Sequence, residues 1–121
     1  MFPNEMRTIQ DFQAFHRWLD EKNNFDTDIL FNMVLLSGEV GEVAQVLRWI
    51  RKRTHLLKNE QPPEEAMETA LSEYRESLGA ELADCFAYLL KLANYAGVDL
   101  HAAYLRKMEE NLHRTWQTPN G

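Results

Sequence analysis

The sequence predicts an all-α protein, because its prolines are few and its apolar residues follow a helical period. The four prolines stand at positions 3, 62, 63 and 119, which leaves long stretches free of this helix breaker. In these stretches apolar residues recur three or four positions apart, and no alternation of apolar and polar residues lasts long enough for a strand. With 121 residues the chain has the length of a single domain, and we expect it to form four helices.

The first helix is expected from Thr8 to about Lys22. Thr8 can cap its first turn, and Asp11 three residues later provides a weak version of the capping box. The apolar side chains that share one face of this helix, and should therefore point into the core, are Ile9, Phe12, Phe15 or His16, and Leu19.

The second helix is expected to start near Asp26 or Asp28 and to continue to about Arg53. Gly38 and Gly41 lie inside it, and each costs about 1 kcal/mol relative to alanine at such a position. We therefore expect another helix or a ligand to approach closely at these glycines. The broad apolar cover of this helix comes from Leu30, Met33, Val34, Leu36, Val40, Val43, Leu47 and Ile50.

A long connection at about 54–63 should separate the second helix from the third. Pro63 suits the first position of a helix, and the third helix then either runs to Asn94 or breaks near Gly79. Gly97 fits the left-handed residue with which many helices end.

The last helix should be capped by Asp99 and run from Leu100 to about Arg114, and residues 117–121 should form a frayed tail. No internal repeat of fixed period and no low-complexity tract interrupts this order. We therefore expect residues 1–121 to form one domain.

Composition and charge limit the classes of partner and compartment. The formal net charge is −6 and the sequence pI is about 5.2, which argues against binding to nucleic acid polymers or anionic membranes. Cys85 is the only cysteine, so no internal disulfide can form. The N-terminus lacks the pattern of a signal peptide, and no uninterrupted apolar run approaches the roughly 20 residues of a membrane span. A cytoplasmic location is the expectation.

Two pairs of acidic residues carry the strongest functional signal. Glu39 and Glu42 are three residues apart, as are Glu81 and Asp84, so each pair shares one face of its helix. Both pairs lie among apolar and small residues, where burying several unpaired carboxylates is costly. A bound divalent cation would remove this conflict, and ligands that are all oxygen atoms favour magnesium or manganese before zinc.

An aromatic residue follows each acidic pair on the same helix face. Trp49 lies seven residues after Glu42, and Tyr88 lies four residues after Asp84. A metal site flanked by two flat rings would suit a nucleotide base. The alternative, that Trp49 and Tyr88 are core aromatics with polar tips, has about equal weight.

The last helix carries a polar stripe of Lys107, Asn111 and Arg114. Together these side chains could donate several hydrogen bonds to phosphate oxygens. For any one of these cations, a solvated surface position is the simpler explanation.

In these motifs the chain resembles the MazG-like nucleotide pyrophosphohydrolases, within the all-α NTP pyrophosphohydrolase group. The family signature is ExxE followed by ExxD on the next long helix, which the segments 39–42 and 81–84 match. The C-terminal pattern of the family is matched by Lys107, Asn111 and Arg114. The resemblance covers about Asp28 to Trp116 and is greatest to the short dCTP-pyrophosphatase-type members.

The resemblance implies a MazG-like four-helix bundle that is completed by oligomerisation, as a homodimer or homotetramer. It also implies a Mg²⁺-dependent enzyme, with Mn²⁺ able to substitute, that hydrolyses a nucleoside triphosphate to the monophosphate and pyrophosphate and cleanses the nucleotide pool. The metal ligands implied are Glu39, Glu42, Glu81 and Asp84, with Glu39 or Glu42 as the general base.

The same resemblance assigns the substrate-binding residues. Lys107, Asn111 and Arg114 would hold the leaving phosphates, and Trp49, Tyr88, His16 and Phe25 would enclose the base. From composition alone, His16 is more simply a structural histidine beside the apolar stripe of the first helix.

Two alternatives remain open. One is a dUTP or phosphoribosyl-ATP pyrophosphohydrolase on the same fold. The other is a non-catalytic helical interaction module, which would show no metal-dependent turnover.

Overall fold

The structure is a computed structural model that describes residues 3–114, and within this range it consists of helices and turns without a strand. A short 3-10 helix, η1 (Pro3–Glu5), precedes four α-helices. These are α1 (Ile9–Asn23), α2 (Ile29–Leu57), α3 (Pro63–Ala96) and α4 (Leu100–Leu112). The predicted all-α class with four helices is confirmed. The predicted tail at 117–121 lies outside the described residues.

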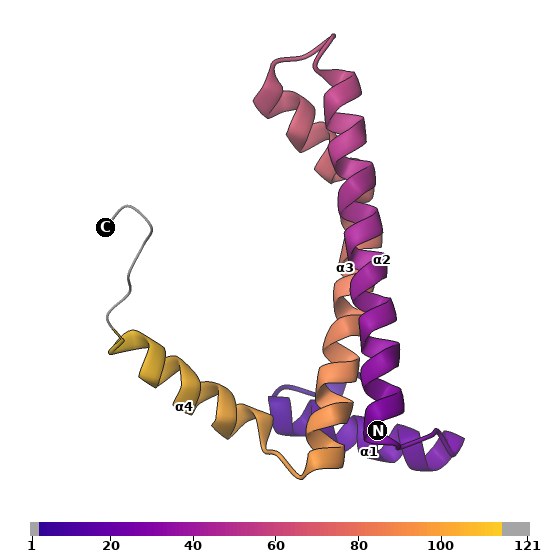
Figure 1. Cartoon of the computed structure of the whole chain (residues 1–121), viewed down its shortest axis with the longest axis vertical. Helices are drawn as coiled ribbons and strands as arrows, with labels where there is room; N and C mark the ends of the chain where they lie inside the picture. Colours follow the sequence, from indigo (N-terminus) through magenta and orange to yellow (C-terminus); the bar gives the residue numbers. More distant parts are fainter. Residues whose placement is uncertain (1–2, 115–121) are drawn as a thin grey trace.

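The two long helices, α2 and α3, form an antiparallel hairpin that makes up most of the molecule (Figure 1). Helix α1 crosses the base of this hairpin and packs mainly against α3, while α4 starts at the same base, contacts α1 and points away from the hairpin (Figure 1). The hairpin therefore has a base, which α1 covers, and a distant tip, where α2 turns into α3.

The predicted helix caps are present. The Thr8 hydroxyl accepts a hydrogen bond from the Asp11 backbone N–H and the Asp11 carboxylate accepts one from the Thr8 N–H, each at 3.0 Å, which completes the capping box. Asp28 and Asp99 cap α2 and α4 through their carboxylates. Gly97 ends α3 with a φ of 69°, the left-handed conformation that glycine adopts without strain.

Helix α2 is longer than the sequence indicated, and the connection to α3 is correspondingly shorter. The helix continues past Arg53 to Leu57, so only residues 58–62 connect it to α3 instead of about 54–63. The Thr54 hydroxyl donates to the Ile50 carbonyl at 2.7 Å, which satisfies this side chain inside the helix. Leu57 is buried, and its burial favours one more helical turn. Helix α3 passes Gly79 without a break.

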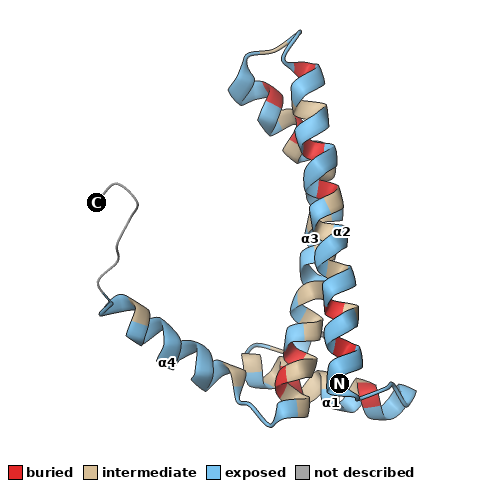
Figure 2. Cartoon of the chain, in the orientation of Figure 1, coloured by how far each residue is buried: buried red, intermediate tan, exposed pale blue. Residues whose placement is uncertain are grey.

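Buried apolar side chains lie in both halves of the hairpin (Figure 2), with Leu36, Leu90 and Ala93 towards its base, and a small main cluster lies in its upper half. This cluster consists of Val46 and Ile50 from α2 and Ala70 from α3, with Leu71, Tyr74 and Leu78 packed against them. At the base, polar contacts join α1 to α3: the Gln13 side-chain amide donates to the Asn94 side chain at 3.0 Å and to the Val98 carbonyl at 2.9 Å.

Large apolar side chains are exposed along the hairpin and on α4. Leu30 and Val34 on α2 are 76% and 65% exposed, and Leu112 on α4 is 79% exposed. Helix α2 is long and apolar enough to cross a membrane by length and composition alone, a test that helices from the cores of soluble proteins also pass.

The glycines of the hairpin do not mark a close approach within one chain. A Cβ atom added at Gly38, Gly41 or Gly79 would meet nothing within 4 Å. The close neighbour expected from the sequence is therefore absent among the described residues of a single copy.

Candidate functional site

Three of the four predicted acidic residues meet in the middle of the hairpin. One carboxylate oxygen each of Glu39 from α2 and of Glu81 and Asp84 from α3 lie within 4.8 Å of one another. Glu39 and Glu81 are half-buried and Asp84 is exposed. The antiparallel pairing of two helices, each with acids one turn apart, brings these groups together. Glu42 lies outside this group and is exposed on α2.

The electrostatics of this acidic cluster, Glu39, Glu81 and Asp84, fit a divalent cation. The pKa of the Glu39 carboxyl is raised, first by the loss of surrounding water and then by the negative charges of Asp84, Glu81 and Glu42. Among residues 3–114 no lysine, arginine or histidine forms an ion pair with the three acids of the cluster. Three convergent carboxylates without a basic partner are the oxygen donor set that Mg²⁺ and Mn²⁺ prefer.

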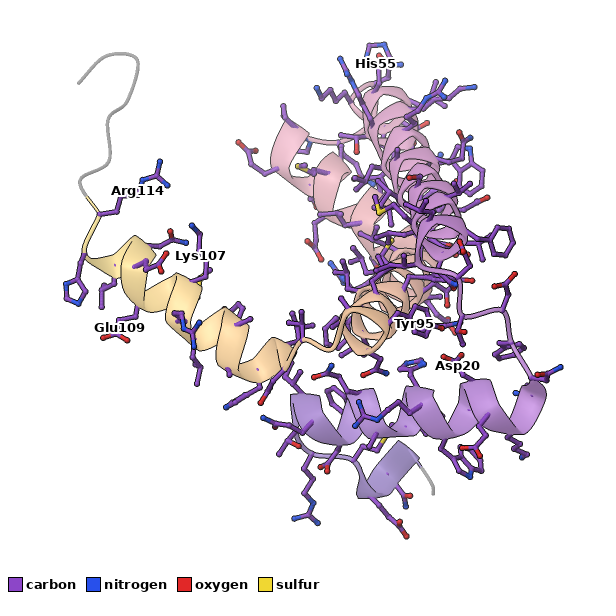
Figure 3. The ribbon with its side chains drawn as sticks, turned by 60° about the horizontal axis from the view of Figure 1, so that its bottom comes forward. Asp20, His55, Tyr95, Lys107, Glu109 and Arg114 are labelled. Atoms are coloured by element: carbon purple, nitrogen blue, oxygen red, sulfur yellow. The ribbon has the colours of Figure 1, made fainter. Side chains whose placement is uncertain are left out.

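A second group of side chains lies towards the base of the hairpin, around the ammonium of Lys91. The Lys91 Nζ atom lies 5.1 Å from the centroid of the Phe25 ring and 5.1 Å from that of the Tyr88 ring. The same atom lies 3.3 Å from a carboxylate oxygen of Asp20, and the Tyr95 hydroxyl donates to the other oxygen of Asp20 at 2.6 Å. Figure 3 shows Asp20 on α1 facing Tyr95 on α3.

This second group adjoins the acidic cluster. Burial raises the pKa of the Tyr88 hydroxyl, and the negative charges of Glu39 and Asp84 raise it further. Tyr88 therefore lies within electrostatic reach of the candidate metal ligands on one side, while its ring contacts Lys91 on the other.

His16 lies between α1 and α3, close to this group. It is half-buried, and burial lowers its pKa, while Asp20 acts in the opposite direction and the Lys91 charge lowers it further. Its ring packs edge-on against Phe15 with the centroids 5.3 Å apart. Three predicted base-binding residues, His16, Phe25 and Tyr88, are thus brought to one end of the hairpin.

The turn that carries Phe25 is fixed by a buried amide. Asn32 is fully buried, and its side-chain NH₂ donates to the backbone carbonyls of Asp26 at 2.8 Å and Asp28 at 2.7 Å. The Phe25 backbone N–H donates to the Asp20 carbonyl at 3.0 Å. These bonds fix the turn between the end of α1 and the start of α2.

Comparisons with known proteins point the same way as the acidic cluster. The chain is 35% identical over 109 residues to dCTP pyrophosphatase 1 of Mus musculus and 37% identical over 110 residues to dCTP pyrophosphatase 1 of Bos taurus. Each match covers 88% of this chain. The chain is a distant homologue of dCTP pyrophosphatase 1. The resemblance to the MazG-like pyrophosphohydrolases is thereby confirmed.

The homology covers only part of the length of these relatives. The chain spans 58% and 59% of the length of these two dCTP pyrophosphatases. No family model matches the chain, and no solved structure matches it.

Trp49 lies far from Tyr88, although both residues were predicted to bind the base. Its ring packs against Tyr74, with the centroids 6.1 Å apart. Tyr74 precedes Tyr88 by fourteen residues on the same helix, which corresponds to about 21 Å along the helix axis. Within one chain Trp49 and Tyr88 therefore do not enclose the same base.

The phosphate-binding candidates on α4 also stand apart from the acids. Figure 3 shows Lys107 on α4, which points away from the hairpin, and Arg114 just beyond the end of this helix. The Lys107 ammonium lies 3.7 Å from a carboxylate oxygen of Glu110, and the Asn111 amide lies 3.9 Å from the Met108 sulfur. The described part of one chain does not assemble the whole predicted MazG-like site, and the roles of these residues stay predictions.

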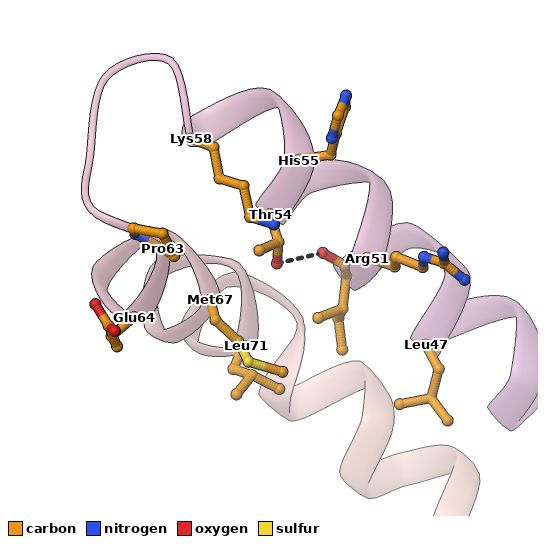
Figure 4. A pocket seen from close by; sticks show the side chains of 10 residues that line it. Leu47, Arg51, Thr54, His55, Lys58, Pro63, Glu64, Met67 and Leu71 are labelled. Carbon is orange, nitrogen blue, oxygen red and sulfur yellow. Dashed lines mark hydrogen bonds between the residues drawn. The ribbon is translucent and has the colours of Figure 1, made fainter.

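A cavity of about 660 Å³ lies elsewhere, at the tip of the hairpin (Figure 4). Leu47, Met67 and Leu71 provide apolar walls, and Arg51 and Lys58 lie at its edge. None of the acids of the cluster lines it. Its chemistry is not that of a metal-dependent hydrolase, so we place the candidate site at the acidic cluster.

Sequence reasoning missed Asp20, Lys91 and Tyr95. A signal for one of them was present, since Lys91 is a charged residue inside the apolar run Leu89 to Ala93, and such a residue is usually paired. Its partner on α1 is 71 positions away in the sequence, so only the fold reveals the pair.

Proposed function

We propose that this protein is a Mg²⁺-dependent pyrophosphohydrolase that converts a deoxynucleoside triphosphate and water to the monophosphate and pyrophosphate. A dCTP-like or modified dNTP is the proposed substrate, and cleansing of the cytoplasmic nucleotide pool the proposed role. The observation that carries this proposal is the convergence of Glu39, Glu81 and Asp84 without a basic partner among residues 3–114. Homology to dCTP pyrophosphatase 1 supports the choice of substrate class.

The roles of the acids follow from their positions. Glu39, Glu81 and Asp84 would hold a divalent ion, which when bound supplies positive charge to the triphosphate oxygens and lowers the pKa of a nearby water. Glu42 stands one turn from Glu39 on α2 and outside the cluster, and it is the proposed acceptor of the proton of the attacking water. The water oxygen then bonds to the α-phosphorus, the bond from this phosphorus to the bridging oxygen breaks, and pyrophosphate leaves.

A second copy of the chain would complete the site. Within one chain Trp49 packs against Tyr74 and does not meet Tyr88, and Lys107 lies on a helix that points away from the hairpin. The exposed apolar side chains of α2 and the open space at Gly38 and Gly41 leave room for another helix to pack there. The proposed homodimer or homotetramer would bring the α4 helix of one copy, with Lys107, Asn111 and Arg114, to the acids of another.

The decisive experiment is a panel of nucleoside triphosphates assayed with and without Mg²⁺, with pyrophosphate and orthophosphate separated as products. We expect pyrophosphate and the monophosphate, only when metal is present. Glu42→Gln and Asp84→Asn should abolish turnover, while Glu76→Gln, an exposed acid on α3 outside the cluster, should retain it. Orthophosphate as the product, or unchanged turnover in Asp84→Asn, would contradict the proposal.

The shared site has its own test. A chain with Asp84→Asn and a chain with Arg114→Ala should each be inactive alone. If one site draws on both chains, mixing the two variants should recover up to about a quarter of the wild-type activity in a dimer, because a quarter of the sites then combine two intact contributions. Light scattering on the same samples measures the number of copies, and a monomer that retains full activity would refute sharing.

A further inference from the structure

Lys91 has surroundings that its ion pair alone does not explain. Its side chain is 12% exposed and that of Asp20 is 8% exposed, so both charges are largely removed from water. Asp20 lies 3.3 Å away on one side, and the rings of Phe25 and Tyr88 lie on the others, each centroid 5.1 Å from the ammonium. These rings come from two different segments, the turn before α2 and the C-terminal part of α3.

The ammonium retains unused capacity for hydrogen bonding. An ammonium group has three N–H donors, and among the described residues Asp20 is its one anionic partner. Aromatic faces attract the positive charge, but they are weaker acceptors than an oxygen or nitrogen with a lone pair. A ligand that offers such an acceptor beside the two rings would therefore find donors already in place.

The Lys91 ammonium is held in position by Asp20, which is itself held by Tyr95. The Tyr95 hydroxyl donates to the second oxygen of Asp20 at 2.6 Å, so that this carboxylate is held between Tyr95 and Lys91. Asp20 and Tyr95 thus act as positioning residues, which hold Lys91 against Phe25 and Tyr88. Preorganised donors of this kind discriminate between ligands more sharply than mobile surface lysines.

We propose that Lys91 is a specificity-determining residue that reads the base of the substrate by donating hydrogen bonds to adjacent acceptor atoms. This inference rests on the proposed function, in which Phe25 and Tyr88 line the base pocket next to the acidic cluster. Cytosine presents two neighbouring acceptors, O2 and N3, whereas uracil and thymine carry an N–H donor at N3. Because an ammonium cannot accept a hydrogen bond, Lys91 favours dCTP over dUTP and dTTP.

The test compares kcat/KM for dCTP and dUTP in variants that keep the neighbourhood of Lys91 intact. Lys91→Met alone leaves the Asp20 charge buried, so the main variant is Lys91→Met with Asp20→Asn, whose side-chain oxygen still accepts from Tyr95. The matched control is Lys22→Met, since the Lys22 ammonium also lies over an aromatic ring, that of Trp18 at 4.9 Å, but on the exposed side of α1. Lys91→Arg tests whether another donor restores the preference.

A substrate probe isolates the acceptor atoms. The triphosphate of the pyrimidin-2-one deoxynucleoside keeps O2 and N3 and lacks the amino group of cytosine. The wild-type protein should treat this compound like dCTP and not like dUTP. If recognition instead depends on the amino group, the compound will be a poor substrate, and that result overturns the assignment to Lys91.

The expected result is a fall of at least tenfold in the dCTP to dUTP ratio of kcat/KM in the double variant, with no change in Lys22→Met and partial recovery in Lys91→Arg. A double variant that turns over dCTP with an unchanged ratio overturns the role of Lys91 and leaves the pyrophosphohydrolase itself standing. A wild-type protein that cleaves no nucleotide with Mg²⁺ overturns the proposed function, and the base assignment with it.

Discussion

Replacing the Glu39 carboxylate by the amide of glutamine should stabilise the protein when no divalent ion is present. Glu39 is half-buried, and one of its oxygens lies within 4.8 Å of an oxygen of Glu81 and of an oxygen of Asp84. Two unit charges at this distance repel by about 1 kcal/mol in a water-like medium. Glu39→Gln removes two such pairs while keeping the size of the side chain.

The expected net gain is smaller than the sum of the two pairs. Asp84 is exposed, and salt and solvent screen charges at such positions. We therefore expect about 1 kcal/mol at low ionic strength, which corresponds to a rise in Tm of roughly 4 °C for a domain of this size. The control Glu76→Gln makes the same chemical change on α3 outside the cluster and should shift Tm by less than about 1 °C.

The pH dependence of this gain has a definite sign. Because the pKa of Glu39 is raised in the folded state above the ordinary value of 4.5, the folded chain holds more protons than the unfolded chain between the two pKa values. Folding stability therefore falls as the pH rises through this window, and the penalty is complete above the raised pKa. The advantage of Glu39→Gln should be present at neutral pH and disappear below the ordinary pKa of glutamic acid.

Magnesium should reverse the order of stability. A ligand that binds only the folded state at a hundred times its Kd adds about 2.7 kcal/mol, and Glu39→Gln should lose most of this gain. Thermal melts of both variants and the wild-type protein, in chelator and in a Mg²⁺ series, measure the effect. Equal or lower stability of Glu39→Gln in chelator, or an equal response of all three proteins to Mg²⁺, would refute the reasoning about the cluster.

Further outcomes concern the framework around the site. Lys91→Met should destabilise the protein by about 3 kcal/mol in urea titrations, since it leaves the Asp20 carboxylate buried without its cation. Adding Asp20→Asn should recover most of this loss. If stability does not recover, the buried charge of Asp20 is not the cause of the loss. Gly97→Ala should cost about 1 kcal/mol, because residue 97 has a φ of 69°, and an unchanged melting temperature would speak against that strain. Thr8→Ala should cost a similar amount through loss of the capping box, visible as fraying of α1 in hydrogen exchange.

Local chemistry made the helix boundaries predictable at most ends. Thr8, Asp99 and Gly97 stand where caps were expected, and Asp28, one of the two expected starts of α2, caps that helix, because capping depends on residues within one turn. The end of α2 was misplaced, since the burial of Leu57 depends on packing in the hairpin and not on local preference.

Part of the candidate site was predictable, because the spacing of residues within one helix is also a local property. The i, i+3 spacing placed Glu81 and Asp84 on one face, and the antiparallel hairpin brought Glu39 to them. The pairing of Lys91 with Asp20 links distant segments, and the direction of α4 depends on contacts beyond its own sequence. Spacing within a helix predicts which groups share a face, but not which helix that face will meet.

The buried amide of Asn32 has a consequence for the evolution and engineering of this chain. It ties two carbonyls of the turn that carries Phe25, although it lies at the start of α2 and is inaccessible to any nucleotide. A library restricted to positions in contact with substrate would omit it. If Phe25 lines the base pocket as proposed, a change at position 32 would alter base selectivity through rotation of the Phe25 ring, without any altered contact to the ligand.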